Sequence, residues 1–70
     1  MTKVDAAKYA GNVLRRLISE NYPSQEEFAF DFGTDVRTVS RYVNTGITKI
    51  PTLQELALFF DISIMDFLPD

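Results

Sequence analysis

The apolar positions along this chain fall into short blocks with the three- and four-residue spacing of one face of an α-helix. The first block predicts a helix over about residues 5–21. Pro23 follows it and biases the preceding residue away from helical dihedral angles. Gly11 lies inside this helix and weakens it by about 1 kcal/mol relative to alanine. The apolar residues of the block are Ala6, Tyr9, Ala10, Val13, Leu14, Leu17 and Ile18.

Two short helices joined by a tight turn are expected next, over about residues 25–32 and 36–44. Ser24 and Glu27 form a capping box, in which the serine oxygen accepts a backbone hydrogen bond and the glutamate bonds back. Gly33 lies at the turn, where a left-handed backbone carries no steric cost for glycine.

The second helix of this pair opens at Asp35, which offers a side-chain N-cap. Ala29 on the first helix and Val39 on the second are expected to face inward where the two helices approach closely. Phe28 and Phe32, four residues apart, point at the core beside Ala29. This spacing predicts two helices at a steep angle, with the first turn of the second one exposed.

Two further helices are predicted near the C-terminal end of the sequence. A capping box over residues 52–55 opens a helix over about residues 53–60, and another over residues 63–66 opens a last helix over 64–68. Asp61 stands between them, where it would adopt a left-handed conformation less readily than glycine. The inward face of the first of these helices consists of Leu53, Leu56, Ala57 and Phe60.

Length and composition limit the class of protein. Seventy residues make one domain, and 46% hydrophobic residues, with six Phe and three Tyr, suffice for a compact helical core. The chain has no cysteine, which excludes a disulfide framework and a thiolate metal site. No apolar run approaches the roughly 18 residues of a membrane span, and the N-terminus lacks the apolar core of a signal peptide. We therefore expect a cytoplasmic protein without membrane contact.

The helix pair and its neighbours resemble the helix-turn-helix domain of the lambda-repressor/Cro family, also called XRE-type regulators. The resemblance covers about residues 4–68 and implies an all-α, compact five-helix DNA-binding domain with a central helix-turn-helix. Residues 50–57 and 61–68 are similar to the fourth and fifth helices of the family. The matching residues of the helix pair are Gln25, Glu27, Phe28, Ala29, Phe32, Gly33, Thr34, Val39, Arg41 and Asn44.

The second helix of the pair carries the residues expected to contact DNA bases. An exposed first turn of this kind fits the major groove. Arg37 is suited to the bidentate contact with guanine O6 and N7, and Arg41, one turn on, to a base or a phosphate. The alternative is a surface helix with two solvated arginines. The expected base-reading residues are Val36, Arg37, Thr38 and Arg41.

Contacts to the DNA backbone are expected from two places. An amide at a helix N-terminus can donate to a phosphate, and the helix dipole adds to this; the resemblance implies that Gln25 also buttresses the reading helix. The resemblance further implies that the loop after the reading helix clamps phosphates, which set register without reading sequence. Lys49 is the only cation of this loop. The expected backbone residues are Gln25, Asn44, Thr45, Thr48 and Lys49.

The last predicted helix is more apolar than one core requires. The resemblance implies that this end contributes to self-association, and a purely core role is the alternative. A homodimer would bind a pseudo-palindrome with half-sites about 10 base pairs apart. The candidate dimer contacts are Ile64, Met65, Phe67 and Leu68.

The charge of the chain opposes a simple DNA-binding interpretation. The net charge is −3, whereas a basic domain is the usual electrostatic sign of nucleic-acid binding. The charge is segregated, however: residues 1–16 carry +3, residues 17–33 carry −4, residues 34–50 carry +2 and residues 51–70 carry −4. The positive segments are those that this fold would turn toward a duplex, so we expect DNA binding with modest nonspecific affinity.

Three side chains have two interpretations each. Arg15 and Arg16 fall off the apolar face of the first helix, and are either solvated or, as the resemblance implies, brace the helix pair or meet a phosphate. Phe30 does not share the inward face of Phe28 and Phe32, so it should be partly exposed. It either contacts a partner or, the interpretation that we favour, fills space against the N-terminal end of the chain.

No catalytic constellation is present, since the chain has neither histidine nor cysteine, and no metal-ligand spacing or phosphate-cradling glycine loop. We expect no enzyme, no metal and no cofactor. Two functions remain: a sequence-specific double-stranded DNA-binding regulator, either a repressor or Cro-like, and an antirepressor-like protein-interaction module whose acidic face meets a basic partner. Net charge favours the second and the intact reading helix the first, which we prefer. The chain could also be the DNA-binding head of a longer regulator.

Overall fold

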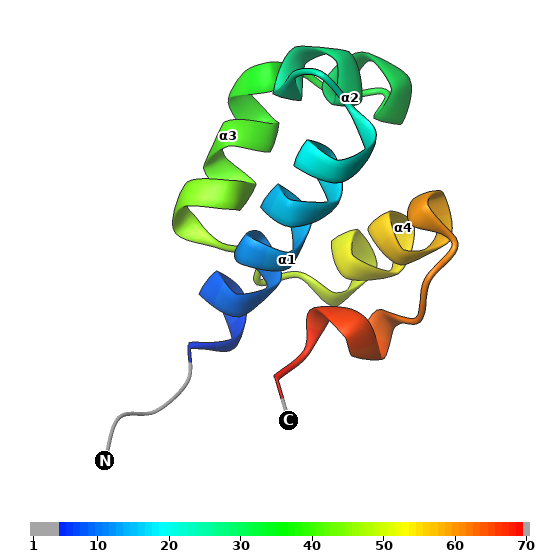
Figure 1. Cartoon of the computed structure of the whole chain (residues 1–70). Helices are drawn as coiled ribbons and strands as arrows, with labels where there is room; N and C mark the ends of the chain where they lie inside the picture. Colours follow the sequence, from blue (N-terminus) through cyan, green and yellow to red (C-terminus); the bar gives the residue numbers. More distant parts are fainter. Residues whose placement is uncertain (1–4, 70) are drawn as a thin grey trace.

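The computed structural model describes residues 5–69, which form four α-helices and one short 3-10 helix (Figure 1). This part of the chain is compact, contains no strand and is 75% helical. Figure 1 shows α1 in the middle of the molecule, with α3 on one side and α4 on the other. The elements are α1 (Ala6–Asn21), α2 (Gln25–Phe32), α3 (Val36–Thr45), α4 (Ile50–Phe60) and η1 (Ile64–Phe67).

The two N-caps predicted around the helix pair are present, but within residues 5–69 the Glu27 side chain does not return the hydrogen bond to the Ser24 backbone that the full capping box requires. The Ser24 hydroxyl accepts a hydrogen bond from the Glu27 backbone N–H at 3.2 Å, and the Asp35 carboxylate accepts one from the Thr38 N–H at 2.7 Å. Gly33 has the left-handed backbone that the turn requires, with φ of 89°. These local signals place α2 and α3 within one residue of their predicted bounds.

The predicted start of α4 is wrong. This helix begins at Ile50, three residues before the predicted residue 53, and the expected capping box over residues 52–55 does not form. Pro51 occupies the first turn, where its missing N–H is not needed by the helix. Lys49 is the N-cap residue and provides no side-chain hydrogen bond to the turn.

The predicted fifth α-helix is instead the single 3-10 turn η1. The Asp66 N–H donates to the Ser63 carbonyl at 3.0 Å, and the Leu68 N–H donates to the Met65 carbonyl at 3.1 Å. Both bonds span three residues, and Pro69 follows directly, so the segment is too short for the four-residue hydrogen bonds of an α-helix. Asp61, before this turn, has the left-handed backbone expected there, with φ of 57°.

One hydrophobic core joins all five elements. Phe28 of α2 lies at its aromatic end, stacked on Phe32 and Phe60 at ring-centroid distances of 5.4 and 5.5 Å. Phe59 and Tyr22 meet the Phe28 ring edge-on. Ala6 and Tyr9, part of the predicted apolar face of α1, are exposed. The buried residues are Ala10, Val13, Leu14, Ile18, Phe28, Ala29, Val39, Val43, Ile47, Leu53, Leu56, Ala57 and Phe67.

The packing of α1 against α3 is the most extensive helix–helix contact of the fold. Gly11 lies at the crossing, where a Cβ atom would collide with the Tyr42 carbonyl oxygen. The chain leaving α3 also meets α1: the Ile47 N–H donates to the Ala7 carbonyl at 3.0 Å. Gly46 has φ of +108°, and a Cβ there would lie 2.6 Å from the Ala7 carbonyl carbon. Two glycines therefore fix where α3 lies on α1.

Candidate nucleic-acid interface

The outward face of α3 carries the residues predicted to contact bases. At about 100° per residue, Arg37 and Arg41 fall at the centre of this face, opposite the buried Val39. Both arginines are exposed. Val36, at the start of the helix, is 40% exposed, and Thr38 is half-buried at the margin of the face. All four residues are thus at least partly accessible to solvent, and the two arginines lie at the centre of the exposed face.

The first turn of α3 is fixed by Asp35. Its carboxylate accepts the Thr38 N–H, and this hydrogen bonding to Thr38 is the main reason why the pKa of Asp35 is lowered. The positive charges of Arg37 and Arg41 lower the pKa of Asp35 further. The cap is therefore ionised at neutral pH, and it holds the front of the helix in place.

The last turn of α3 is fixed by Arg15 of α1. The Arg15 Nη2 donates to the Val43 carbonyl at 3.0 Å and to the Asn44 side-chain oxygen at 3.1 Å. The Asn44 amide nitrogen in turn donates to the Ser40 hydroxyl at 3.1 Å. Arg15 thus braces α3, one of the roles predicted for it. Arg16 is exposed as well, and within residues 5–69 its side chain makes no such bond to α3. Asn44, predicted to contact DNA, has its amide engaged within the chain.

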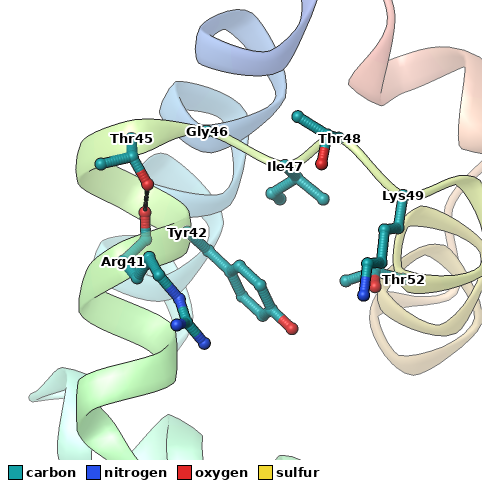
Figure 2. A pocket seen from close by; sticks show the side chains of 8 residues that line it. All are labelled: Arg41, Tyr42, Thr45, Gly46, Ile47, Thr48, Lys49 and Thr52. Carbon is teal, nitrogen blue, oxygen red and sulfur yellow. Dashed lines mark hydrogen bonds between the residues drawn. The ribbon is translucent and has the colours of Figure 1, made fainter.

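A hollow of about 470 Å³ lies between the last turns of α3 and the start of α4 (Figure 2). It brings together three of the predicted backbone-contacting residues, Thr45, Thr48 and Lys49, with Arg41 from the predicted base-reading set. The Thr45 hydroxyl donates back to the Arg41 carbonyl. Two cations thus reach this hollow from different elements, one from α3 and one from the loop before α4.

The hollow also contains residues that the sequence did not indicate as functional, Tyr42 and Thr52. Figure 2 shows the Tyr42 ring extending from α3 toward α4, between Arg41 and Lys49. By the helical period Tyr42 falls near the buried Val39 and Val43, but its side chain is half-buried at the margin of that face. Its role depends on where α4 starts, and the sequence pattern placed that start three residues too late.

The start of α4 gives this hollow a further property. No side chain caps the first turn of α4, and Pro51 has no N–H to offer. The backbone N–H groups at this end, the helix dipole, Arg41 and Lys49 all favour an anion, and the hydroxyl groups of Tyr42 and Thr52 add hydrogen-bond donors. A phosphate group has the charge and the acceptor oxygens that this arrangement suits.

Gln25 lies apart from this hollow, half-buried in the first turn of α2 beside the Ser24 cap.

The candidate dimer contacts differ in their exposure to solvent. Met65 is 67% exposed and Ile64 and Leu68 are half-buried, but Phe67 is 0% exposed and belongs to the core. Burial in the monomer removes Phe67 from any surface that a second molecule can meet.

Comparison with known proteins assigns no family, because no family model, curated protein or solved structure matches this chain significantly. Within residues 5–69, histidine, cysteine and carboxylate side chains form no cluster able to hold a metal ion. No helix in the same range has the length and apolar character needed to cross a bilayer.

Proposed function

We propose that this chain is a sequence-specific double-stranded DNA-binding transcriptional regulator, repressor or Cro-like, on a lambda-repressor-like fold. The observation that carries the proposal is the outward face of α3, where Arg37 and Arg41 project side by side from a helix held at both ends. Asp35 holds the front and Arg15 the rear. A rigid helix with an exposed cationic first turn is what a major groove accommodates.

The residues of α3 divide by the contacts that their chemistry permits. Arg37 donates two hydrogen bonds to guanine O6 and N7, the commonest specific contact in protein–DNA complexes. Val36 offers an apolar contact to a thymine methyl group, and Thr38 a hydroxyl to a neighbouring base edge. Arg41 lies where the base-reading face meets the hollow, so it reaches a base or a phosphate.

Phosphate contacts fix the register of the protein on the duplex. The hollow between α3 and α4 receives one phosphate, held by Lys49, Thr48 and the first turn of α4, with Tyr42 and Thr52 as further donors. Thr45 and Asn44 hold the end of α3 beside it through their internal hydrogen bonds. Gln25 at the start of α2 binds a second phosphate with the N–H groups of that helix.

A homodimer on a pseudo-palindromic operator completes the proposal. The exposed apolar side chains suited to a dimer contact are Met65, with the half-buried Ile64 and Leu68. Leu58 of α4 is 82% exposed and borders a hollow of about 350 Å³ that Ile64 also lines, so the surface extends onto α4. Two-fold symmetry then sets the half-sites about 10 base pairs apart.

The decisive experiment is selection from a random duplex library, with wild type, Arg37→Ala and Arg16→Ala run at the same salt concentration. Arg16→Ala is the matched control, because it removes another exposed arginine, from α1. Wild type and Arg16→Ala should enrich the same two-fold motif. Arg37→Ala should lose preference at one position of each half-site, a cost of about 1–3 kcal/mol. If wild type enriches no motif even at low salt, the DNA-binding proposal fails.

A further inference from the structure

The solvent-facing side of α2 carries an exposed aromatic ring among negative charges. At about 100° per residue, Phe28, Ala29 and Phe32 lie on one side of this helix and pack into the core. The other side consists entirely of three carboxylates and Phe30. Phe30 is 85% exposed, and the residues that the structure describes leave it uncovered. We call the following residues the Phe30 face: Tyr22, Glu26, Glu27, Phe30 and Asp31.

These five residues line a hollow of about 520 Å³. One wall is fixed in advance, because the Tyr22 hydroxyl donates to the Asp31 carboxylate at 3.0 Å. The Tyr22 ring also meets the buried Phe28 edge-on at 5.5 Å. Partial burial of the tyrosine and, to a lesser degree, its hydrogen bond to Asp31 raise the pKa of Tyr22, so this donor keeps its proton at neutral pH. The Tyr22 wall of the hollow is therefore held in place by contacts with the buried core and with Asp31.

Folding explains only part of this face. Glu26 and Glu27 lie in the first turn of α2, where negative charge is favourable to the helix dipole. Asp31 lies in the last turn, where the dipole is itself negative, and Phe30 gains nothing from burial. Helix stability therefore accounts for neither Phe30 nor Asp31, although Asp31 accepts the hydrogen bond of Tyr22.

The surrounding charge defines what fits here. Between residues 17 and 36 the chain contains four glutamates and aspartates from Glu20 to Asp31, a fifth carboxylate at Asp35 and no lysine or arginine. A phosphate backbone is repelled by the carboxylates of the Phe30 face, so this face is not a second DNA site. Gln25 does not belong to it, because it is half-buried on the side of α2 that carries Phe28 and Phe32. A segment with the opposite charge is attracted to it, and an exposed ring provides an apolar anchor and a cation–π surface.

We propose that the Phe30 face binds a basic segment of another protein, in which lysine or arginine side chains flank an apolar or aromatic one. The apolar side chain packs into the hollow between Phe30 and Tyr22. The cations pair with Glu26, Glu27 and Asp31 around it. This interaction goes beyond the proposed DNA binding and uses a different helix, so the regulator would hold DNA and a protein partner at once.

A displayed library of random peptides tests the proposal, with wild-type protein as bait. The enriched peptides should combine lysine or arginine with an aromatic or large aliphatic residue. Synthetic versions should bind wild type in a salt-sensitive manner. Phe30→Ser should weaken this binding about tenfold or more, as expected for a central aromatic contact, and Glu27→Gln should weaken it to a lesser degree. Tyr9→Ser is the matched control, since Tyr9 is an aromatic residue that is 39% exposed on α1, and it should bind like wild type.

Three results would overturn the proposal: no enriched basic peptide, equal binding by Phe30→Ser, or equal loss with Tyr9→Ser. Self-association of wild type that Phe30→Ser abolishes in sedimentation would also overturn it, because the face would then belong to a second copy of this chain. The test is separate from that of DNA binding. Phe30→Ser should keep the operator preference of wild type, and Arg37→Ala should keep the peptide affinity.

Discussion

At the scale of single residues, Gly11 disfavours helix formation, yet the packing of α3 against α1 requires glycine at this position. By propensity alone, alanine would stabilise α1 by about 1 kcal/mol at this site. The α3 backbone, however, lies directly against Gly11, and the atom in contact is the Tyr42 carbonyl oxygen, not the end of a flexible side chain. A backbone atom that is part of a helix moves only if the whole helix moves.

We therefore predict that Gly11→Ala destabilises the protein by about 1–3 kcal/mol, because the overpacking cost exceeds the gain in helix propensity. Denaturant unfolding measured by circular dichroism checks this. Asn12→Ala is the control: Asn12 is exposed on the same helix, so alanine there should be neutral or stabilising. An unchanged or increased stability of Gly11→Ala would mean that α3 does not lie against α1 as described.

At the scale of elements, α3 depends on its two ends, since a helix of 10 residues has little stability of its own. Asp35 stabilises the front through the Thr38 N–H, and Arg15 satisfies a carbonyl at the rear. The cap is sensitive to pH, because the pKa of Asp35 is lower in the folded protein than its ordinary value of 3.8.

The direction of this pH dependence follows from linkage. A carboxyl group whose folded pKa is lowered contributes its full stabilisation above pH 3.8 and loses it as the pH falls through the folded pKa. We predict that the stability difference between wild type and Asp35→Asn shrinks over that acidic range, since asparagine still caps but does not ionise. Thermal unfolding from neutral pH downward measures it, with Glu55→Gln, an exposed site away from any cap, as the control. A difference that is constant with pH would contradict the prediction.

The elements also show which parts of the structure could be predicted from the sequence. The α2–α3 pair was predicted closely because its signals are local: Ser24, Gly33 and Asp35 act on backbone groups within a few residues. The start of α4 was not predicted correctly, because a proline such as Pro51 can lie either within the first turn of a helix or in the segment before the helix. The last helix was predicted as an α-helix but is a 3-10 turn, because only four residues lie between Ser63 and Leu68.

In the candidate site, too, local features could be predicted from the sequence and contacts between distant residues could not. The exposure of Arg37 and Arg41 follows from the helical period of α3 alone, and the sequence predicted it. The hollow beside them depends on how α4 lies relative to α3, which no local pattern specifies, so Tyr42 and Thr52 went unrecognised. The engagement of Asn44 by Arg15 likewise joins residues 29 positions apart. Contacts between residues far apart in the sequence are therefore the part of the site that local sequence patterns do not predict.

At the scale of the whole molecule, the excess of negative charge limits how strongly the proposed DNA binding can rely on phosphate contacts. The net charge is −3, and of the seven lysines and arginines, Arg15 is already bonded to the end of α3. Among the cations of residues 5–69, those that face the candidate site are Arg37, Arg41 and Lys49. If Arg37 is committed to a base, a dimer neutralises about four phosphates, far fewer than a basic DNA-binding protein of similar size would. Specific contacts must then supply most of the affinity.

This count predicts a shallow salt dependence for operator binding. The logarithm of the association constant should fall with the logarithm of salt concentration with a slope of about −4 per dimer, since each neutralised phosphate contributes about −0.9. Lys49→Ala should make the slope shallower by about 2 per dimer, and Arg16→Ala, which removes a cation from α1, should leave it unchanged. Fluorescence anisotropy with a labelled operator over a range of salt concentrations measures all three slopes. A wild-type slope steeper than about −7 would require more phosphate contacts than α3 and its loop can make, and would place DNA on a wider surface that includes the basic residues of α1.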